Sequence, residues 1–133
     1  MGAYVASQLV KAMLKRRLQV NGAQVLILGL TFKENCPDLR NTRVIDVIAE
    51  LREYGVHVDV HDPWVDVTEA NQEYGLDLIT TLETSTYDGI ILAVAHEKYC
   101  KAGAAELRSY GTPDHVFFDL KSIFARDESD LRL

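Results

Sequence analysis

The feature that most constrains this chain is a series of short apolar runs that alternate with segments of helical periodicity. Residues 23–30 (AQVLILGL) and 88–95 (DGIILAVA) are almost continuously apolar, which is typical of strands buried on both faces. Residues 56–61 (VHVDVH) alternate between apolar and polar side chains, and residues 115–120 (HVFFDL) form a last apolar run. Together with a shorter run at residues 76–80, these segments predict the strands of a sheet.

The segments between these runs carry helical signals. The clearest predicted helix covers residues 41–54, which Asn41 or Thr42 can cap at the start. Its apolar stripe comprises Val44, Ile45, Ile48 and Leu51. Residues 66–74 and 97–110 predict two further helices, each of which is followed by a glycine. The charged residues 125–133 predict a frayed end or a short helix.

A helix is also predicted ahead of the first strand, over residues 2–18, because Val5, Leu9 and Met13 recur at helical spacing. It precedes the alternation, so it is either a terminal packing helix or the tail of an upstream element. The alternation predicts a three-layer, Rossmann-like α/β domain with a mostly parallel sheet and helices on both faces. The length of 133 residues suits a single domain.

The composition excludes several classes of partner and site. A formal net charge of -6 argues against nucleic acid or an anionic membrane as the main partner. The sequence shows neither a signal peptide nor an apolar stretch of membrane-spanning length. Its two cysteines, Cys36 and Cys100, fit neither a CxxC pair nor a metal-ligand spacing. We therefore expect no metal site and a reducing, cytoplasmic location.

The long loop after the first predicted strand is the richest candidate site. Ligands of open α/β sheets bind outside the carboxyl ends of the strands, where this loop begins. It places Lys33, Arg40 and Arg43 beside Glu34 and Asp38, just before a predicted helix. Such cations can hold phosphate oxygens, helped by the amides at a helix start, or they can pair with the two acids on a solvated loop. The residues alone leave both possibilities open.

Other strand ends offer weaker candidates, and neither a GxGxxG turn nor a P-loop motif occurs. Asp62 can accept from a ribose hydroxyl, although the Asp62-Pro63 step that simply ends a strand is the commoner case. His96 can act as a general base, although a capping or surface role is the favoured interpretation. Trp64 can stack on a ring or pack under the loop, and Lys121 can reach a phosphate or lie exposed in solvent.

Five stretches carry a resemblance to a known family. They are residues 2–11 (GAYVASQLVK), residues 25–43 (VLILGLTFKENCPDLRNTR), Asp62-Pro63, residues 93–96 (AVAH) and residues 117–123 (FFDLKSI). The chain resembles the C-terminal, nucleotide-binding domain of the UDP-glucose/GDP-mannose dehydrogenase family over nearly its whole length. The loop at residues 31–43 looks closest to the branch that oxidises UDP-N-acetylhexosamines for surface polysaccharides.

The resemblance implies roles for particular residues. Phe32 and Lys33 match positions that contact the nucleotide-sugar, and Lys121 matches the region of a further basic substrate contact. Arg40 matches an arginine that reaches the phosphates of NAD. The family's catalytic cysteine lies in a glycine-rich segment that this sequence lacks, and Cys36 does not replace it. No catalytic residue is therefore expected among the residues of this chain.

The resemblance also implies an organisation and partners. Residues 1–20 would be the end of a central connecting helix, and residues 21–133 the nucleotide-sugar-binding domain. An N-terminal domain of the same polypeptide would bind most of the NAD, and the full-length enzyme would be a homodimer. Such an enzyme transfers two hydrides to NAD and converts the sugar's C6 alcohol into the acid.

Two alternatives from other classes remain at this point. One is a stand-alone nucleotide-binding or regulatory module, which would use the same cationic loop without a partner domain. An exposed apolar face on the leading helix would instead favour a missing domain. The other is a response-regulator-like switch, which ranks low because Asp62 alone does not supply the acidic cluster that such a switch needs.

Overall fold

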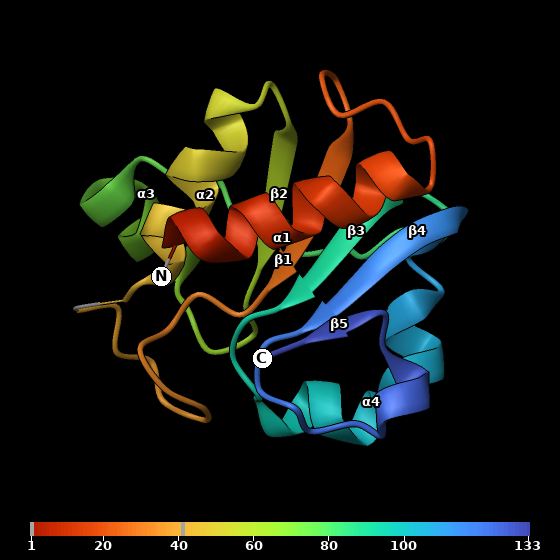
Figure 1. Ribbon diagram of the computed structural model, residues 1–133. Helices are drawn as coiled ribbons and strands as arrows, with labels where there is room; N and C mark the ends of the chain where they lie inside the picture. The colour runs from red at the N-terminus through yellow and green to blue at the C-terminus, as the bar shows by residue number, and fades with distance from the viewer. Residues whose placement is uncertain (1, 41) are drawn as a thin grey trace.

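The computed structural model describes residues 2–40 and 42–133, so Asn41, one of the two expected helix caps, lies outside the described residues. Within these ranges the chain forms a five-stranded, wholly parallel sheet of order β2-β1-β3-β4-β5 (Figure 1). The strands are β1 (Gln24–Leu28), β2 (His57–His61), β3 (Tyr87–Leu92), β4 (Gly111–Asp119) and β5 (Leu131–Arg132). The predicted α/β fold with a parallel sheet is confirmed.

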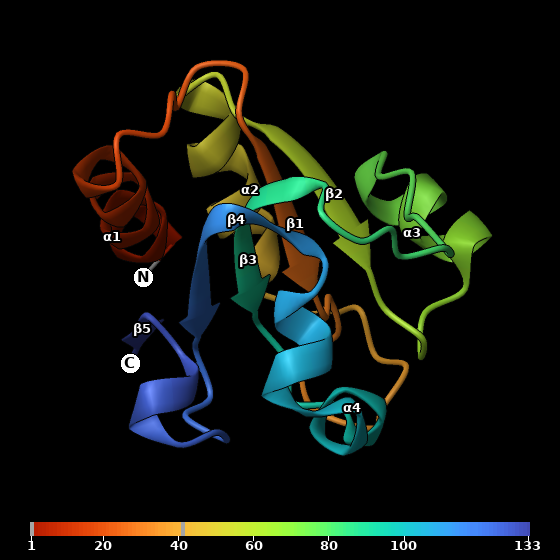
Figure 2. The same ribbon diagram turned by 90° about the vertical axis from the view of Figure 1, so that its right-hand side faces the viewer.

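Helices cover both faces of this sheet, as predicted. α1 (Gly2–Lys15) and α2 (Val44–Glu53) pack on the face formed by side chains such as Ile27 and Phe118. α4 (Glu97–Arg108) packs on the opposite face, against Leu28 and Phe117, so the sheet lies between the two helical layers (Figure 2). The remaining helices are α3 (Val67–Tyr74), which lies to the left of α2 in Figure 1, and the short 3-10 helix η1 (Arg126–Glu128).

The leading helix is part of the domain core. Val5, Leu9 and Met13 on α1 are buried against α2 and the sheet, as their helical spacing predicts. Among the large apolar side chains of α1 in the described residues, Tyr4 and Leu14 are the exposed ones. The apolar face of this helix is therefore covered within the chain itself.

The structure differs from the sequence prediction at both ends of the chain. α1 ends at Lys15 rather than near residue 18, because Arg17 adopts a left-handed backbone conformation (φ 62°). The C-terminal residues form β5 in addition to the short helix, and Leu131 aligns with Phe118 of β4. A two-residue strand is too short to show a pattern in the sequence, and its formation depends on pairing with the neighbouring strand β4.

Residues 76–80 are not a strand, which corrects the prediction. Leu76 and Leu78 are buried in the core. The alternating pattern therefore reflects burial of one side of the segment, which does not pair with a neighbouring strand as part of the sheet. The amide of Ile79 donates to the carbonyl of Val60 at 2.9 Å, beside the edge strand β2. The predicted helix at residues 97–110 is confirmed as α4, with a break at Gly103 (φ 86°).

A glycine allows the end of β1 to approach the loop after β3. Gly29 has φ +102°, and a β-carbon there would lie 2.6 Å from Cβ of Val94. Only a glycine fits this contact without displacement of one loop. The close approach brings the loop after β1 beside the loop after β3, and both loops contribute to the candidate site.

Candidate functional site

A pocket of about 300 Å³ opens at the carboxyl ends of the strands. Its apolar lining comes mainly from α1, α2 and the loop after β3, and includes Val5, Val44, Val47 and Val94. Its polar lining comes from the loop after β1 and from the residues after β4, and comprises Thr31, Thr42, Arg43 and Lys121. This is the edge at which ligands of parallel sheets bind.

The structure brings two of the four predicted binding residues into this pocket. Phe32, with 54% of its surface exposed, and Lys121 both line it. Lys33 and Arg40 are exposed on the same loop but outside the pocket lining. The pocket therefore combines one aromatic ring and two cationic side chains, Lys121 and Arg43, with an apolar lining.

The two arginines of the loop lie in different surroundings. The Arg40 side chain is 87% exposed, and its Nε lies 3.1 Å from Oδ1 of Asp38, so this pair follows the solvated-loop interpretation. The hydrogen bond from Arg40 lowers the pKa of the Asp38 carboxyl. Arg43 instead lines the pocket, although no local pattern distinguishes it from the neighbouring cationic residues.

Thr42 joins this loop to the start of α2. Its hydroxyl donates to the carbonyl of Leu30 at 2.6 Å and accepts from the amide of Val44 at 3.3 Å. The helix begins at Val44 rather than at residue 41, and its N-cap is Arg43, so Thr42 is not the cap that the sequence predicts. Its hydroxyl nevertheless binds a free amide of the first helical turn. The contact also fixes Arg43 beside the pocket.

Asp62 is the centre of a buried polar network. Its Oδ2 accepts from the amides of Leu30 at 2.7 Å and Thr31 at 3.1 Å, and Oδ1 accepts from the amide of Trp64 at 2.8 Å. Burial raises the pKa of Asp62, but hydrogen bonds from His96, Leu30 and Trp64 outweigh burial and leave the pKa below its ordinary value. Asp62 is buried and both of its oxygens are engaged with the protein, which favours a structural role over a ribose contact.

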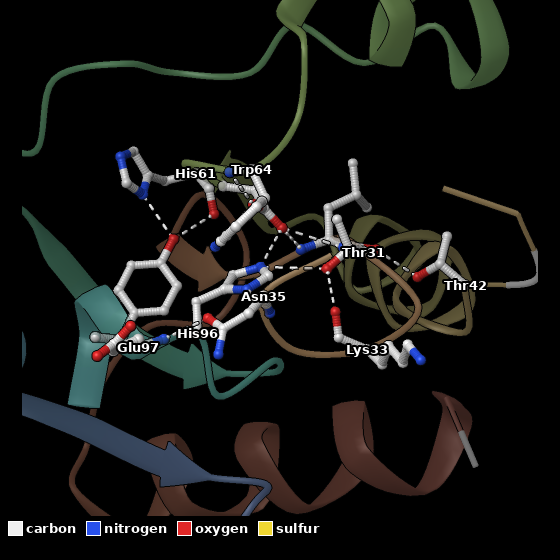
Figure 3. Close-up of polar contacts among 11 residues, drawn as sticks. Thr31, Lys33, Asn35, Thr42, His61, Trp64, His96 and Glu97 are labelled. Atoms are coloured by element: carbon white, nitrogen blue, oxygen red, sulfur yellow. Dashed lines mark hydrogen bonds and ion pairs between the residues drawn. The ribbon is translucent and has the colours of Figure 1, made fainter. Parts of the chain in front are cut away.

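His96 is completely buried, which corrects the surface role favoured from the sequence. Its Nδ1 accepts from the amide of Asn35 at 2.9 Å, so the ring proton is placed on Nε2. Nε2 then donates to Oδ2 of Asp62 at 2.9 Å and lies 3.2 Å from the hydroxyl of Thr31 (Figure 3). The side chain makes no capping hydrogen bond to α4, and with both nitrogens engaged it is not placed to act as a general base.

Asn35 completes the network, a role that no local sequence pattern indicates. Its side-chain oxygen accepts from the amide of Glu97 at 2.8 Å, at the start of α4. Its backbone is left-handed (φ 55°), a conformation that asparagine tolerates better than most residues. The signal in the sequence was only a loop asparagine, because its partners lie more than sixty residues away.

Other candidate residues have limited roles in this arrangement. Trp64 is partly exposed, and its ring centroid lies 6.3 Å from that of His96, so it packs over the network. Cys36 and Cys100 are both free thiols. Within the described residues, no group of three or more His, Cys, Asp or Glu side chains is arranged to hold a metal ion. None of the helices in the described ranges has the length and apolar character that a membrane crossing requires.

This fold and this pocket define a class, namely an α/β domain with a pocket of cationic and apolar side chains at the carboxyl edge of a parallel sheet. A sequence model of the UDP-glucose/GDP-mannose dehydrogenase family, UDP binding domain, matches residues 26–126. The chain belongs to this family.

Relatives support the same assignment. The chain is 59% identical, over all of its 133 residues, to a UDP-N-acetyl-D-glucosamine 6-dehydrogenase of Pseudomonas aeruginosa, of which it covers 32%. It is 50% identical over its full length to a protein of the same name from Salmonella typhi, of which it covers 31%. Protein CapL of Staphylococcus aureus is 46% identical over 128 residues, which are 96% of this chain and 30% of that protein. The chain thus spans about a third of the length of these curated relatives.

A solved structure supports the fold. The NDP-N-acetyl-D-galactosaminuronic acid dehydrogenase from Methanosarcina mazei superposes with a TM-score of 0.76 at 24% identity, over 95% of this chain and 26% of that one. The likeness at this identity concerns the arrangement of the sheet and helices.

Proposed function

We propose that this chain is the nucleotide-sugar-binding part of an NAD-dependent UDP-sugar 6-dehydrogenase. The enzyme oxidises the C6 hydroxymethyl group of a UDP-hexose or UDP-N-acetylhexosamine to the carboxylate, in cytoplasmic synthesis of surface polysaccharide. The observation that carries the proposal is the pocket at the carboxyl edge of the sheet, where Phe32, Arg43 and Lys121 line the same pocket as several apolar side chains. Family membership and the names of the relatives support UDP as the nucleotide.

The residues of the pocket suit the two halves of a nucleotide-sugar diphosphate. Lys121 and Arg43 offer cationic donors for phosphate oxygens, and the exposed ring of Phe32 offers a stacking face. Lys33 is exposed on the same loop outside the pocket lining, and in this proposal it contacts the bound ligand from there. Binding energy supplied here, away from C6, would hold the reacting carbon in position.

The cofactor would be bound mainly by another domain of the same polypeptide. NAD supplies the hydride acceptor for each of the two oxidation steps. Arg40 would contact the phosphates of the NAD held by that domain, because its guanidinium is almost fully exposed outside the pocket. Its pairing with Asp38 orients the guanidinium without burying it. The nucleophile for the chemistry would also come from the rest of the polypeptide, and the complete enzyme would be a homodimer.

Calorimetric titration of the chain with UDP, UDP-N-acetylglucosamine, GDP and NAD tests the binding proposal. We expect the UDP ligands to bind in preference to GDP and NAD. Lys121→Ala should weaken UDP binding by about tenfold or more, since it removes a charged hydrogen-bond donor. Lys33→Ala and Phe32→Ala should weaken it too. Lys101→Ala is the matched control, because Lys101 is an exposed lysine that pairs with Glu97 on α4.

A chimera tests the catalytic part of the proposal. This chain replaces the matching segment of the Pseudomonas aeruginosa relative, and NADH formation from UDP-N-acetylglucosamine is recorded. The full proposal is supported if the chimera is active and if Arg40→Ala lowers this activity by raising the KM for NAD. UDP binding by the chain with an inactive but folded chimera would instead favour a stand-alone binding module. Equal binding of UDP and GDP, or equal losses in Lys121→Ala and Lys101→Ala, would contradict the assignment of the pocket.

A further inference from the structure

The segment Leu30–Asn35, which carries Phe32 and Lys33 in the first half of the loop after β1, is held at both of its ends by contacts with buried side chains. At the start, the amides of Leu30 and Thr31 donate to one carboxylate oxygen of Asp62. At residue 35, Asn35 makes two contacts with the start of α4. Its amide donates to His96, and its side-chain oxygen accepts from the amide of Glu97.

These two attachments meet in one buried pair. Nε2 of His96 lies 2.9 Å from Oδ2 of Asp62, and both side chains are 0% exposed. Thr31 contributes a link inside the loop, because its hydroxyl donates to the carbonyl of Lys33 at 2.9 Å (Figure 3). The backbone from Leu30 to Asn35 is therefore tied to Asp62 after β2 and to the start of α4, while the side chains of Phe32 and Lys33 remain exposed.

We propose that Asp62 and His96 are positioning residues that fix the backbone of the loop and so present Phe32 and Lys33 to the nucleotide. The role rests on the proposed function, in which these two side chains contact the ligand. A loop that is ordered before binding does not lose that conformational freedom when the ligand arrives. The hydrogen bond between Asn35 and His96 is decisive, because it attaches the end of the Leu30–Asn35 segment that is distant from β1.

Two substitutions at residue 96 separate the two hydrogen bonds of the ring. The amide oxygen of asparagine can take the place of Nδ1, so His96→Asn retains an acceptor for Asn35 and loses the donor to Asp62. The amide nitrogen of glutamine can take the place of Nε2, so His96→Gln retains the donor to Asp62 and loses the acceptor for Asn35. Asparagine leaves the larger void, so a merely structural role for His96 would make His96→Asn at least as harmful.

The experiment measures UDP affinity by calorimetry, amide exchange at Leu30, Thr31 and Asn35, and the free energy of unfolding. His96→Gln should bind UDP about tenfold more weakly and exchange the Asn35 amide faster than the wild type. His96→Asn should stay close to the wild type in both. Tyr99→Phe is the control, since it removes a neighbouring buried hydroxyl that contacts His61 and leaves the loop untouched. It should lower stability without a change in UDP affinity.

The outcomes separate this proposal from the proposed function. A wild-type chain that binds no UDP overturns the function assigned to the pocket, whatever the exchange data show. Exchange at Asn35 that is the same in His96→Gln and the wild type overturns the positioning role, even if UDP binds. The positioning role is also overturned if His96→Gln binds UDP as tightly as Tyr99→Phe does.

Discussion

At the residue scale, the interactions with the largest consequences involve side chains that do not contact the pocket. Asp62 accepts four hydrogen bonds, from three backbone amides and from His96. A carboxylate with this many donors is stabilised in its charged form. Because its partners lie in the loop after β1, in the loop after β2 and at the start of α4, one carboxylate holds together three segments at the edge of the sheet.

This environment predicts a specific pH dependence for Asp62→Asn. The folded-state pKa of Asp62 lies below its ordinary value of 3.8, so its ionised form stabilises the fold above that pH. That contribution is lost as the pH falls from about 4 through the lower folded-state pKa. Asp62→Asn should lower the free energy of unfolding by about 1–3 kcal/mol at pH 7. The difference from the wild type should shrink as the pH is lowered below about 4.

Urea unfolding followed between pH 7 and pH 2.5 checks this expectation. Asp127→Asn is the control, since Asp127 lies exposed on η1. A difference between wild type and Asp62→Asn that stays constant over the whole range would contradict the ionised network.

At the element scale, α1 is the helix whose role the sequence left open. Leu9 is 0% exposed and belongs to the core cluster that includes α2 and one face of the sheet. The methyl groups of Leu9 also lie 3.3 and 3.4 Å from the position that a β-carbon on Gly89 of β3 would occupy. The helix therefore closes the face of the sheet that α2 alone leaves partly uncovered.

Leu9→Ala tests how strongly α1 stabilises the domain. Loss of a fully buried leucine should reduce the free energy of unfolding by about 2–5 kcal/mol, because a cavity replaces packed side-chain atoms. Leu14→Ala on the same helix should change it by less than about 0.5 kcal/mol, since Leu14 is 57% exposed. Thermal or urea unfolding of both variants provides the measurement. Equal effects would mean that α1 does not pack on the domain in solution.

At the scale of the whole molecule, Asp130 joins segments from both ends of the chain. Its carboxylate pairs with Arg16 after α1 at 2.5 Å and with Arg108 of α4 at 2.8 Å, and it accepts from the amide of Phe117 in β4 at 2.8 Å. Burial raises the pKa of Asp130, but the hydrogen bonds from Phe117 and Arg16 outweigh it and leave the pKa lowered. The contact places β5 beside β4, because Asp130 directly precedes β5.

Asp130→Ala should therefore loosen the C-terminal segment. We expect a loss of about 1–3 kcal/mol in the free energy of unfolding, because a partly buried carboxylate with three donors is removed. Lys101→Ala, which breaks an exposed pair with Glu97, should cost less than about 0.5 kcal/mol. Faster amide exchange in residues 126–132 in Asp130→Ala alone would localise the effect. Unchanged exchange there would show that β5 is held by other contacts.

Local patterns in the sequence were enough to predict the parallel α/β architecture and the family. Apolar runs mark β1 and β3, and alternating polarity marks β2, because burial on two faces or on one face leaves a local pattern. The resemblance carried by residues 25–43 leads to the same family that the comparisons establish. It also named Phe32 and Lys121, which the fold places in one pocket.

Tertiary structure alone decided which polar side chains meet. Arg43 and Arg40 lie in one loop, yet one lines the pocket and the other pairs with Asp38 in solvent. His96 and Asn35 are joined only because the ends of β1 and β3 are neighbours in the sheet. A local pattern encodes burial and periodicity, whereas a hydrogen bond between residues sixty-one positions apart depends on strand order and loop geometry.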